Sequence, residues 1–352
     1  MAAFHIPFPE AVCLMAMSTL LDHFRAVRAW AEKHSADATL DMKTFEVEIR
    51  CANRYFTFYP QFSIVQQGQL GYVRQLMPAA SGFCGWRPYR EYKTPLTTDK
   101  LLFKSYFASQ GLRVPATWPA DRQPPLPYIQ KRQVGSFGEG MCGPALPSQL
   151  ERLGMPTPSG CFAEQFIEGS SVKVWLWGAR PVCADIQGWP TVAGDGISRI
   201  ETLIAQRLHG AEGSSFGADR ALMLACIRFQ GLDTDSIPEP GRSIWIDFRY
   251  GRSFRSPSAS RNTPNRLPEL RQRCGSQLLD AGAAVARGLQ QSTLAPVVSS
   301  IDAVLDGEGR LWWLELNSNP LFPHHGYDTM LSELFDRPTT SISPSEHGAT
   351  PP

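Results

Sequence analysis

The sequence of 352 residues has almost no excess of charge of either sign. Lys and Arg together number 34 and Asp and Glu together number 33, which leaves a formal charge of +1 at pH 7. Proteins that bind nucleic acids or anionic membranes by general electrostatics need a strong positive excess. The charge balance therefore excludes that class, and we expect neither nucleic acid nor a membrane as a partner.

Cysteine clusters and long apolar runs are also missing. The eight cysteines are scattered, with no CxxC pair and no Cys/His cluster, so neither a zinc site nor a disulfide framework is expected. The longest uncharged run near the N-terminus, residues 11–21, is too short to span a bilayer, and no basic segment precedes it as in a signal peptide. We therefore expect a soluble, cytoplasmic protein with reduced thiols.

What is present is an ordinary globular composition with little lysine. The chain has 43% apolar and 19% charged residues, and its length suffices for two or three domains. Only seven of its 34 basic residues are lysines. Any short segment that uses lysine instead of arginine is therefore a candidate for a specific role.

The first part of the chain predicts one helix and one hairpin. Apolar residues recur at spacings of three and four over residues 11–33, which is typical of an amphipathic helix. Two alternating runs, 44–50 and 55–59, predict a β-hairpin. The following stretch, 78–95, is rich in Gly, Pro and Trp, and we interpret it as a domain boundary.

The rest of the chain mixes helices and strands without a regular βαβ rhythm, which predicts α+β domains with largely antiparallel sheets. Asp99 offers an N-cap and Gly111 a stop for a helix over residues 100–110. Other expected helices cover 221–227 and 270–289, and expected strands cover 128–132, 161–167, 172–177, 243–248, 297–305 and 310–316. Residues 253–268 read as a long loop, and the Thr/Ser/Pro-rich residues from 337 onward predict a disordered tail.

The segment 301–317 predicts a hairpin that carries acidic chemistry. In the expected register, which turns around Gly307-Glu308, Asp302 pairs with Trp313, so that one face holds Asp302, Trp313, Glu315 and Asn317. Three oxygen-bearing side chains on an otherwise apolar face are costly unless something binds them. Mg²⁺ held together with substrate phosphates is the natural ligand. For an isolated hairpin, hydrated carboxylates at an exposed strand end are the simpler interpretation.

A second segment pairs a scarce lysine with a glycine loop. The expected strand 128–132 carries Lys131 and runs into a loop with Gly135, Gly138 and Gly140. Glycines let consecutive backbone amides turn toward an anion, and lysine supplies a compact positive charge. No Gly-Lys-Ser/Thr follows, so this is not a Walker loop. Glycine-rich hairpin loops are common, so the segment alone is weak support for a phosphate site.

Four separated segments together resemble the ATP-grasp superfamily. They are Asp99-Lys100 opening a helix that ends in Gly-Leu-x-Val-Pro, Lys131 before the glycine loop, the run Phe162-Ala163-Glu164-Gln165-Phe166-Ile167-Glu168-Gly169, and Asp302 with Glu315-x-Asn317. Residues 192–204 are similar to a segment of cyanophycin-synthetase-type ligases, a group that resembles glutathione synthetases and D-Ala-D-Ala ligases. The resemblance covers residues 95–335, and the first 90 residues match no family that we can name.

The resemblance implies a role for each matching residue. ATP phosphates are bound by Lys100 and Lys131 and covered by a flexible loop with Gly135, Ser136, Gly138 and Gly140. Adenine lies against the hinge at Glu164, Gln165 and Ile167, and Glu168 replaces the usual ribose-binding acid, because Ser171 stands near that position. Lys173 lies near ATP or substrate, and magnesium is bound by Asp302, Glu315 and Asn317. The Arg-x-x-x-Asn segment of related ligases is not recognisable, and Arg249 is our choice for gripping the anionic intermediate or the substrate carboxylate with two bonds.

The implied architecture is an ATP-grasp fold. It consists of an atypical N-terminal α/β domain (1–95), a central lid subdomain (96–187), a C-terminal catalytic subdomain (188–335) and a disordered tail (336–352). The implied reaction uses ATP and Mg²⁺ to activate a small-molecule carboxylate as an acyl-phosphate, which an amine then displaces to form an amide. Lys131 and Arg249 are the expected catalytic residues. A homodimer is only a prior, taken from homo-oligomers in general.

Two alternatives stay open at the level of sequence. A kinase on the same fold would phosphorylate a hydroxyl and would need a base, for which His324, His325 or Asp328 stand close after the metal segment. A non-catalytic nucleotide-binding module is less well supported, because both lysines and all three metal positions are retained. The sequence does not identify the acid or the amine.

Overall fold

The computed structural model describes residues 8–66, 69–78, 80–135, 140–147, 160–209, 219–251, 265–293 and 295–336. Every pairing between its described strands is antiparallel, and helices pack against the sheets, so the predicted α+β class is confirmed. In the described ranges, none of the helices combines the length and apolar character that a transmembrane segment needs. The predicted tail from residue 337 onward lies outside the described residues.

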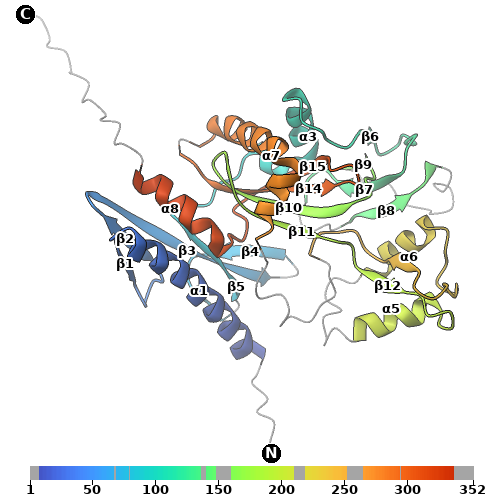
Figure 1. Ribbon diagram of the computed structural model, residues 1–352, viewed down its shortest axis with the longest axis horizontal. Coiled ribbons are helices and arrows are strands. Elements are labelled where there is room, and N and C mark those ends of the chain that lie inside the picture. The colour runs from blue at the N-terminus through green and yellow to red at the C-terminus, as the bar shows by residue number, and fades with distance from the viewer. Residues whose placement is uncertain are drawn as a thin grey trace, which may run out of the picture.

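The N-terminal part is a five-stranded antiparallel sheet beside two helices (Figure 1). Its strands are β1 (Asp37–Leu40), β2 (Val47–Cys51), β3 (Arg54–Gln66), β4 (Gln69–Val73) and β5 (Ala80–Arg87). The predicted hairpin is confirmed as β2 and β3, and the predicted helix as α1 (Phe8–Lys33). Helix α8 (Tyr327–Asp336), from the other end of the chain, joins α1 in the same apolar cluster, in which the ring centroids of Trp30 and Phe335 lie 5.1 Å apart. The first and last described elements therefore share one core.

Residues 78–95, which we interpreted as a domain boundary from their composition, contain a buried strand. Strand β5 lies inside this stretch and pairs with β3, and its residues Phe83 and Trp86 are fully buried. The glycine that suggested a loop serves close packing instead. Gly85 has a φ of +105°, and a Cβ there would lie 3.1 Å from the hydroxyl oxygen of Tyr327. The composition of this strand, which is rich in Gly and Trp, is typical of loops, so the strand could not be recognised from sequence.

A second, four-stranded sheet follows in the order β6-β9-β7-β8. It comprises β6 (Thr117–Pro119), β7 (Tyr128–Arg132), β8 (Cys142–Ala145) and β9 (Cys161–Gln165). The short helix α2 (Pro95–Thr98) leads into α3 (Lys100–Ser109), whose N-cap Asp99 accepts from the amides of Leu101 and Leu102. This cap confirms the predicted start of the helix and fixes Lys100 in its first turn.

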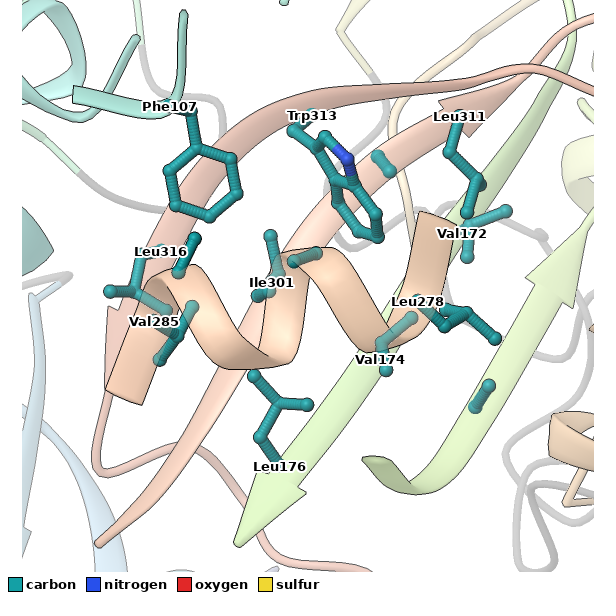
Figure 2. Packing of buried hydrophobic residues seen from close by; sticks show 14 of the residues in the cluster. Phe107, Val172, Val174, Leu176, Leu278, Val285, Ile301, Leu311, Trp313 and Leu316 are labelled. Carbon is teal, nitrogen blue, oxygen red and sulfur yellow. The ribbon is translucent and has the colours of Figure 1, made fainter. Parts of the chain in front are cut away.

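The central sheet has the order β11-β10-β14-β15. Its strands are β10 (Ser170–Trp177), β11 (Arg180–Gln187), β14 (Val298–Leu305) and β15 (Leu311–Ser318). One face packs against α7 (Leu267–Gln290), and Figure 2 shows Val172, Val174 and Ile301 between the strands and Leu278 and Val285 of the helix. Successive strand residues alternate between faces, so the opposite face carries Lys173 and Asp302.

Residues 191–245 add a smaller unit of strands β12 (Thr191–Ala193) and β13 (Ser243–Trp245) and helices α5 (Ile200–His209) and α6 (Arg220–Phe229). The predicted division placed β10 and β11 in the central subdomain, apart from β14 and β15. In the structure β10 pairs with β14 along its whole length. The expected boundary at residue 187 therefore separates strands of one sheet.

Candidate active site

One row of charged side chains crosses a single face of the central sheet. Asp185 of β11 lies opposite Lys173 of β10, and Lys173 lies opposite Asp302 of β14. Asp302 in turn lies opposite Glu315 of β15. Lys173 Nζ lies 2.6 Å from Asp302 Oδ1, and Asn317 Nδ2 donates to Asp302 Oδ2 at 2.9 Å. The structure thus brings together the three predicted metal-site residues on the face that carries Lys173.

The expected register of the β14–β15 hairpin is wrong: Leu305 pairs with Leu311, one residue beyond its expected partner, and the pairing shifts by a further residue at Asp302. Asp302 pairs with Glu315, whereas the next residue, Ala303, pairs with Trp313, so β15 contains one extra residue at this point. Such a bulge turns the side chains beyond it to the opposite face. Trp313 is consequently buried in the cluster that contains α7 and Phe107 of α3 (Figure 2). The predicted apolar lining of the acidic face by Trp313 does not exist.

Lys100 joins the acidic row to the glycine loop. Its Nζ lies 3.0 Å from Glu315 Oε2 and donates to the carbonyl oxygen of Gly135 at 2.5 Å. Its backbone amide donates to Gln133 at 3.1 Å, so the first turn of α3 is bound to the strand end that precedes the loop. Gly135 and Gly140 both have positive φ, at +156° and +67°. The predicted loop residues Ser136 and Gly138 lie outside the described residues.

The two carboxylates of the row respond differently to their surroundings. Burial raises the pKa of Asp302. Attraction to Lys173 lowers this pKa but does not offset the effect of burial, and repulsion from Glu315 raises the pKa further. Burial would also raise the pKa of Glu315, but Lys100, Lys131 and Lys173 together outweigh it and lower this pKa. Glu315 is therefore held as an anion by three surrounding ammonium groups.

A second cluster of charges, Lys104–Glu164–Lys131, lies between α3 and the four-stranded sheet. Lys104 Nζ lies 2.6 Å from Glu164 Oε2, and Lys131 Nζ lies 2.7 Å from Glu164 Oε1. Only 4%, 1% and 6% of the side chains of Lys104, Glu164 and Lys131 are exposed. Two lysines thus share one buried carboxylate, each at its own oxygen. Lys131 and Glu164 are predicted site residues, whereas the sequence analysis missed Lys104.

The predicted hinge lies at the end of β9. Glu164 points to the lysines, and the Gln165 backbone amide donates to Ala116 at 2.8 Å. Gln165 Oε1 accepts from the amide of the same alanine. Within the described part of the chain, the main-chain amide and carbonyl of Ile167 have no hydrogen-bond partner. Glu168 is exposed. The main chain of Ile167 is therefore available to form hydrogen bonds with a ligand.

Arg249 is engaged by an acid of its own segment. Its Nη2 donates to Asp247 Oδ2 at 2.7 Å and its Nε to Asp247 Oδ1 at 3.1 Å, and Asp247 is completely buried. Its Nη1 also lies 3.8 Å from Asp219. The bidentate partner that was predicted for Arg249 is thus, in this structure, a carboxylate of the protein itself.

Tyr250, next to Arg249, and Asp185 of β11 are two groups that the sequence analysis missed. Tyr250 donates to Asp185 Oδ2 at 2.9 Å, and its ring lies 5.3 Å from Lys173 Nζ. Burial and Asp185 raise the pKa of Tyr250, which keeps its hydroxyl a donor. Gln187 donates to the same oxygen at 2.6 Å. Asp185 occupies an apolar-rich strand in sequence, so only the pairing with β10 reveals its place in the row.

The histidines considered as bases lie beside the N-terminal helix. His324 and His325 have ring centroids 4.0 Å apart, and His324 is 6.1 Å from His23 of α1. Burial lowers the pKa of His23 to about 3, with His324 adding repulsion, so His23 is neutral and bonds to Tyr327 at 3.0 Å. Asp328 lies 3.7 Å from Lys33 of the same helix. In the described residues none of these groups contacts Asp302 or Glu315.

Comparison with other proteins gives similar structures but no family by sequence. No protein-family model matches the sequence, and no curated protein matches it. A bifunctional glutathione synthetase from Pasteurella multocida is similar over 86% of this chain and 41% of its own, with 14% identity and a TM-score of 0.40. An L-amino acid ligase from Bacillus licheniformis is similar over 63% of this chain and 40% of its own, with 13% identity and a TM-score of 0.31.

A third similar structure is a D-alanine–D-alanine ligase from Bacillus anthracis, matched over 68% of this chain and 62% of its own, with 12% identity and a TM-score of 0.33. This chain therefore spans about two fifths of the length of the first two proteins and somewhat less than two thirds of the third. All three superpositions are partial, and the roles of residues in this chain are inferred from its own contacts.

Proposed function

We propose that the chain is an ATP-grasp carboxylate–amine ligase that uses ATP and Mg²⁺. One observation carries the proposal: lysines from separate segments converge on the acids of one site. Lys100 of α3 lies 3.0 Å from Glu315, and Lys173 of β10 lies 2.6 Å from Asp302. Burying several charged side chains costs free energy unless they bind a ligand or pair with each other. A polyphosphate and a metal ion are the ligands that need both signs of charge at one place.

The acidic row fits a magnesium ion by the chemistry of its donors. In the described ranges, no group of three or more His, Cys, Asp and Glu side chains is arranged to hold a metal by itself. Asp302 and Glu315 supply two carboxylates, and Asn317, whose amide nitrogen is used by Asp302, supplies an amide oxygen. Mg²⁺ is typically bound by one or two carboxylates, with phosphates and waters completing its coordination. The bound ion would neutralise charge on the phosphate oxygens.

The chain's own residues account for the binding of the nucleotide. Lys100 and Lys131 place positive charge beside the glycine loop, where the phosphates would lie. The main chain of Ile167 would form hydrogen bonds with the adenine. On phosphate binding, Lys100 would exchange Glu315 for a phosphate oxygen, and the carboxylate of Glu315 would then be free to hold the metal. A contact of Arg249 with the anionic intermediate requires a similar exchange, because Asp247 holds its guanidinium.

The chemical steps need no protein nucleophile. A substrate carboxylate oxygen attacks the γ-phosphorus, the bond from that phosphorus to the β–γ bridging oxygen breaks, and ADP leaves. The nitrogen of an amine then attacks the acyl carbon, phosphate leaves with the former acyl C–O bond pair, and the nitrogen loses a proton to give an amide. Positioning and electrostatic stabilisation are sufficient for both steps. The kinase alternative has less support, since His324 and Asp328, two of its three candidate bases, contact residues of α1.

ADP release tests the proposal. Wild-type protein is incubated with ATP, with and without Mg²⁺, against a matrix of amino acids and small carboxylates, and products are identified by mass spectrometry. We expect Lys131→Met and Glu315→Gln to abolish Mg²⁺-dependent ADP release while circular dichroism stays unchanged. The matched control is Lys43→Met, which removes an exposed lysine far from the site in sequence. Normal turnover by either site variant, or a phosphorylated product formed without an amine, would contradict the proposal.

A further inference from the structure

Lys104 makes none of the proposed ligand contacts, yet its side chain is as deeply buried as that of Lys131, which makes one. Its side chain is 4% exposed and its ammonium group lies 2.6 Å from Glu164 Oε2. Burying a lysine costs free energy that a neutral side chain would avoid. Lys104 also follows Lys100 by about one helical turn, so both lysines project from one face of α3. The position therefore calls for a reason beyond packing.

The charges of the Lys104–Glu164–Lys131 cluster supply that reason. With both lysines protonated and Glu164 ionised, the cluster carries a net charge of +1. Without the charge of Lys104, Glu164 and Lys131 cancel each other and offer an anion no net attraction. Moreover, when Lys131 turns to a phosphate, Glu164 loses one of its two partners. Lys104 then remains as the partner that keeps the buried carboxylate from being unpaired.

We propose that Lys104 is a positioning residue of the nucleotide site: it neutralises Glu164 so that the charge of Lys131 is available to the phosphates. The proposal rests on the proposed function, because it assumes that phosphates bind at Lys131. Lys104 itself touches no phosphate. Its effect passes through Glu164, whose second oxygen holds Lys131 at 2.7 Å.

This role makes nucleotide affinity depend on pH. Burial lowers the pKa of Lys104 to about 8, with Glu164 of β9 opposing this shift, Lys131 of β7 adding to it, and Glu315 of β15 opposing it weakly. As pH rises through about 8, the cluster changes from +1 to neutral. The protonated fraction of Lys104 falls from about nine tenths at pH 7 to about one tenth at pH 9. If nucleotide binding requires protonated Lys104, the affinity for nucleotide falls about tenfold over this range.

Calorimetric titration with MgADP and MgATP at pH 7, 8 and 9 tests the proposal. We expect the dissociation constant of wild type to rise about tenfold over this range. Lys104→Met should bind weakly and with little dependence on pH, whereas Lys104→Arg should keep its affinity at pH 9, because arginine stays charged. Lys43→Met is the control and should follow wild type. Circular dichroism confirms that each variant is folded.

The double variant Lys104→Met/Glu164→Gln separates this role from a structural one. With Glu164 neutral, Lys131 needs no compensating charge, so affinity should recover relative to Lys104→Met and stay independent of pH. A merely structural role predicts that the second substitution weakens binding further. If wild type and Lys104→Met bind nucleotide equally at every pH, or if the double variant shows no recovery, this proposal is overturned alone. If wild type binds no nucleotide, the proposed function is overturned with it.

Discussion

The buried ammonium group of Lys104 makes the stability of the folded chain depend on pH even without a ligand. Its pKa is about 8 in the folded chain, against an ordinary value of 10.5, chiefly because of burial. Below about pH 8, both the folded and the unfolded chain carry the proton, and the folded chain bears the full cost of burying the charge. Between pH 8 and 10.5 the unfolded chain binds the proton and the folded chain does not. The contribution of Lys104 to stability therefore rises with pH in this window.

The size of the effect follows from the two pKa values. The lowering from 10.5 to about 8 corresponds to about 3 kcal/mol of free energy. Methionine has a similar length and no charge, and Glu164 keeps Lys131 as its partner in the variant. We therefore expect Lys104→Met to raise the free energy of unfolding by about 3 kcal/mol at pH 7. The difference from wild type should narrow above pH 8 and vanish near pH 10.5.

Urea unfolding followed by tryptophan fluorescence measures this difference at pH 7, 8, 9 and 10. Other titrating groups contribute to both proteins and cancel when the variant is compared with wild type at the same pH. Lys43→Met, which removes an exposed lysine, should show a difference from wild type that does not change over the same range. The reasoning is refuted if Lys104→Met is less stable than wild type at pH 7, or if its difference is constant with pH.

Two further predictions concern packing. Gly169→Ala should lower the free energy of unfolding by about 2 kcal/mol or more, because a Cβ would lie 2.2 Å from the carbonyl oxygen of Leu305. An unchanged midpoint of urea unfolding would contradict this prediction and would mean that β14 shifts to accommodate the Cβ. Trp313→Ala should lower the free energy of unfolding by about 3–5 kcal/mol, because the ring is 1% exposed between α3 and α7, and a loss below about 1 kcal/mol would contradict that burial.

Helices and strands with a clear apolar period could be predicted from sequence alone. The helix over 100–110 became α3 because its N-cap and stop are local signals. The hairpin over 301–317 was also predicted, but its register was not. Registers depend on pairing between strands, and the bulge opposite Asp302 and Ala303 leaves no local mark in the sequence. A single inserted residue therefore sent Trp313 to the core and kept Glu315 and Asn317 beside Asp302.

The candidate site was predictable where residues match motifs and not where contacts cross between sheets. Lys100, Lys131, Asp302 and Glu315 were found by spacing and resemblance. Lys104 was missed, although it lies four residues after Lys100 in the same helix. Helical spacing places both on one face, but only the packing of α3 on β9 shows that this face is buried against Glu164. A buried ion pair between segments 60 residues apart has no signature in a single sequence.

The charges of the candidate site explain why the proposed nucleotide would need a metal ion with it. Four of the seven lysines of the chain gather here: Lys100, Lys104, Lys131 and Lys173. They are matched by four carboxylates, those of Glu164, Asp302, Glu315 and, at the end of the row, Asp185. A neutral site can reorganise its pairs around a polyphosphate, but it cannot offset the charge that the polyphosphate brings into partly buried surroundings. Under the proposed function, each divalent cation would offset two of those charges, and Asp302 and Glu315, once released by Lys173 and Lys100, would be the groups that bind it.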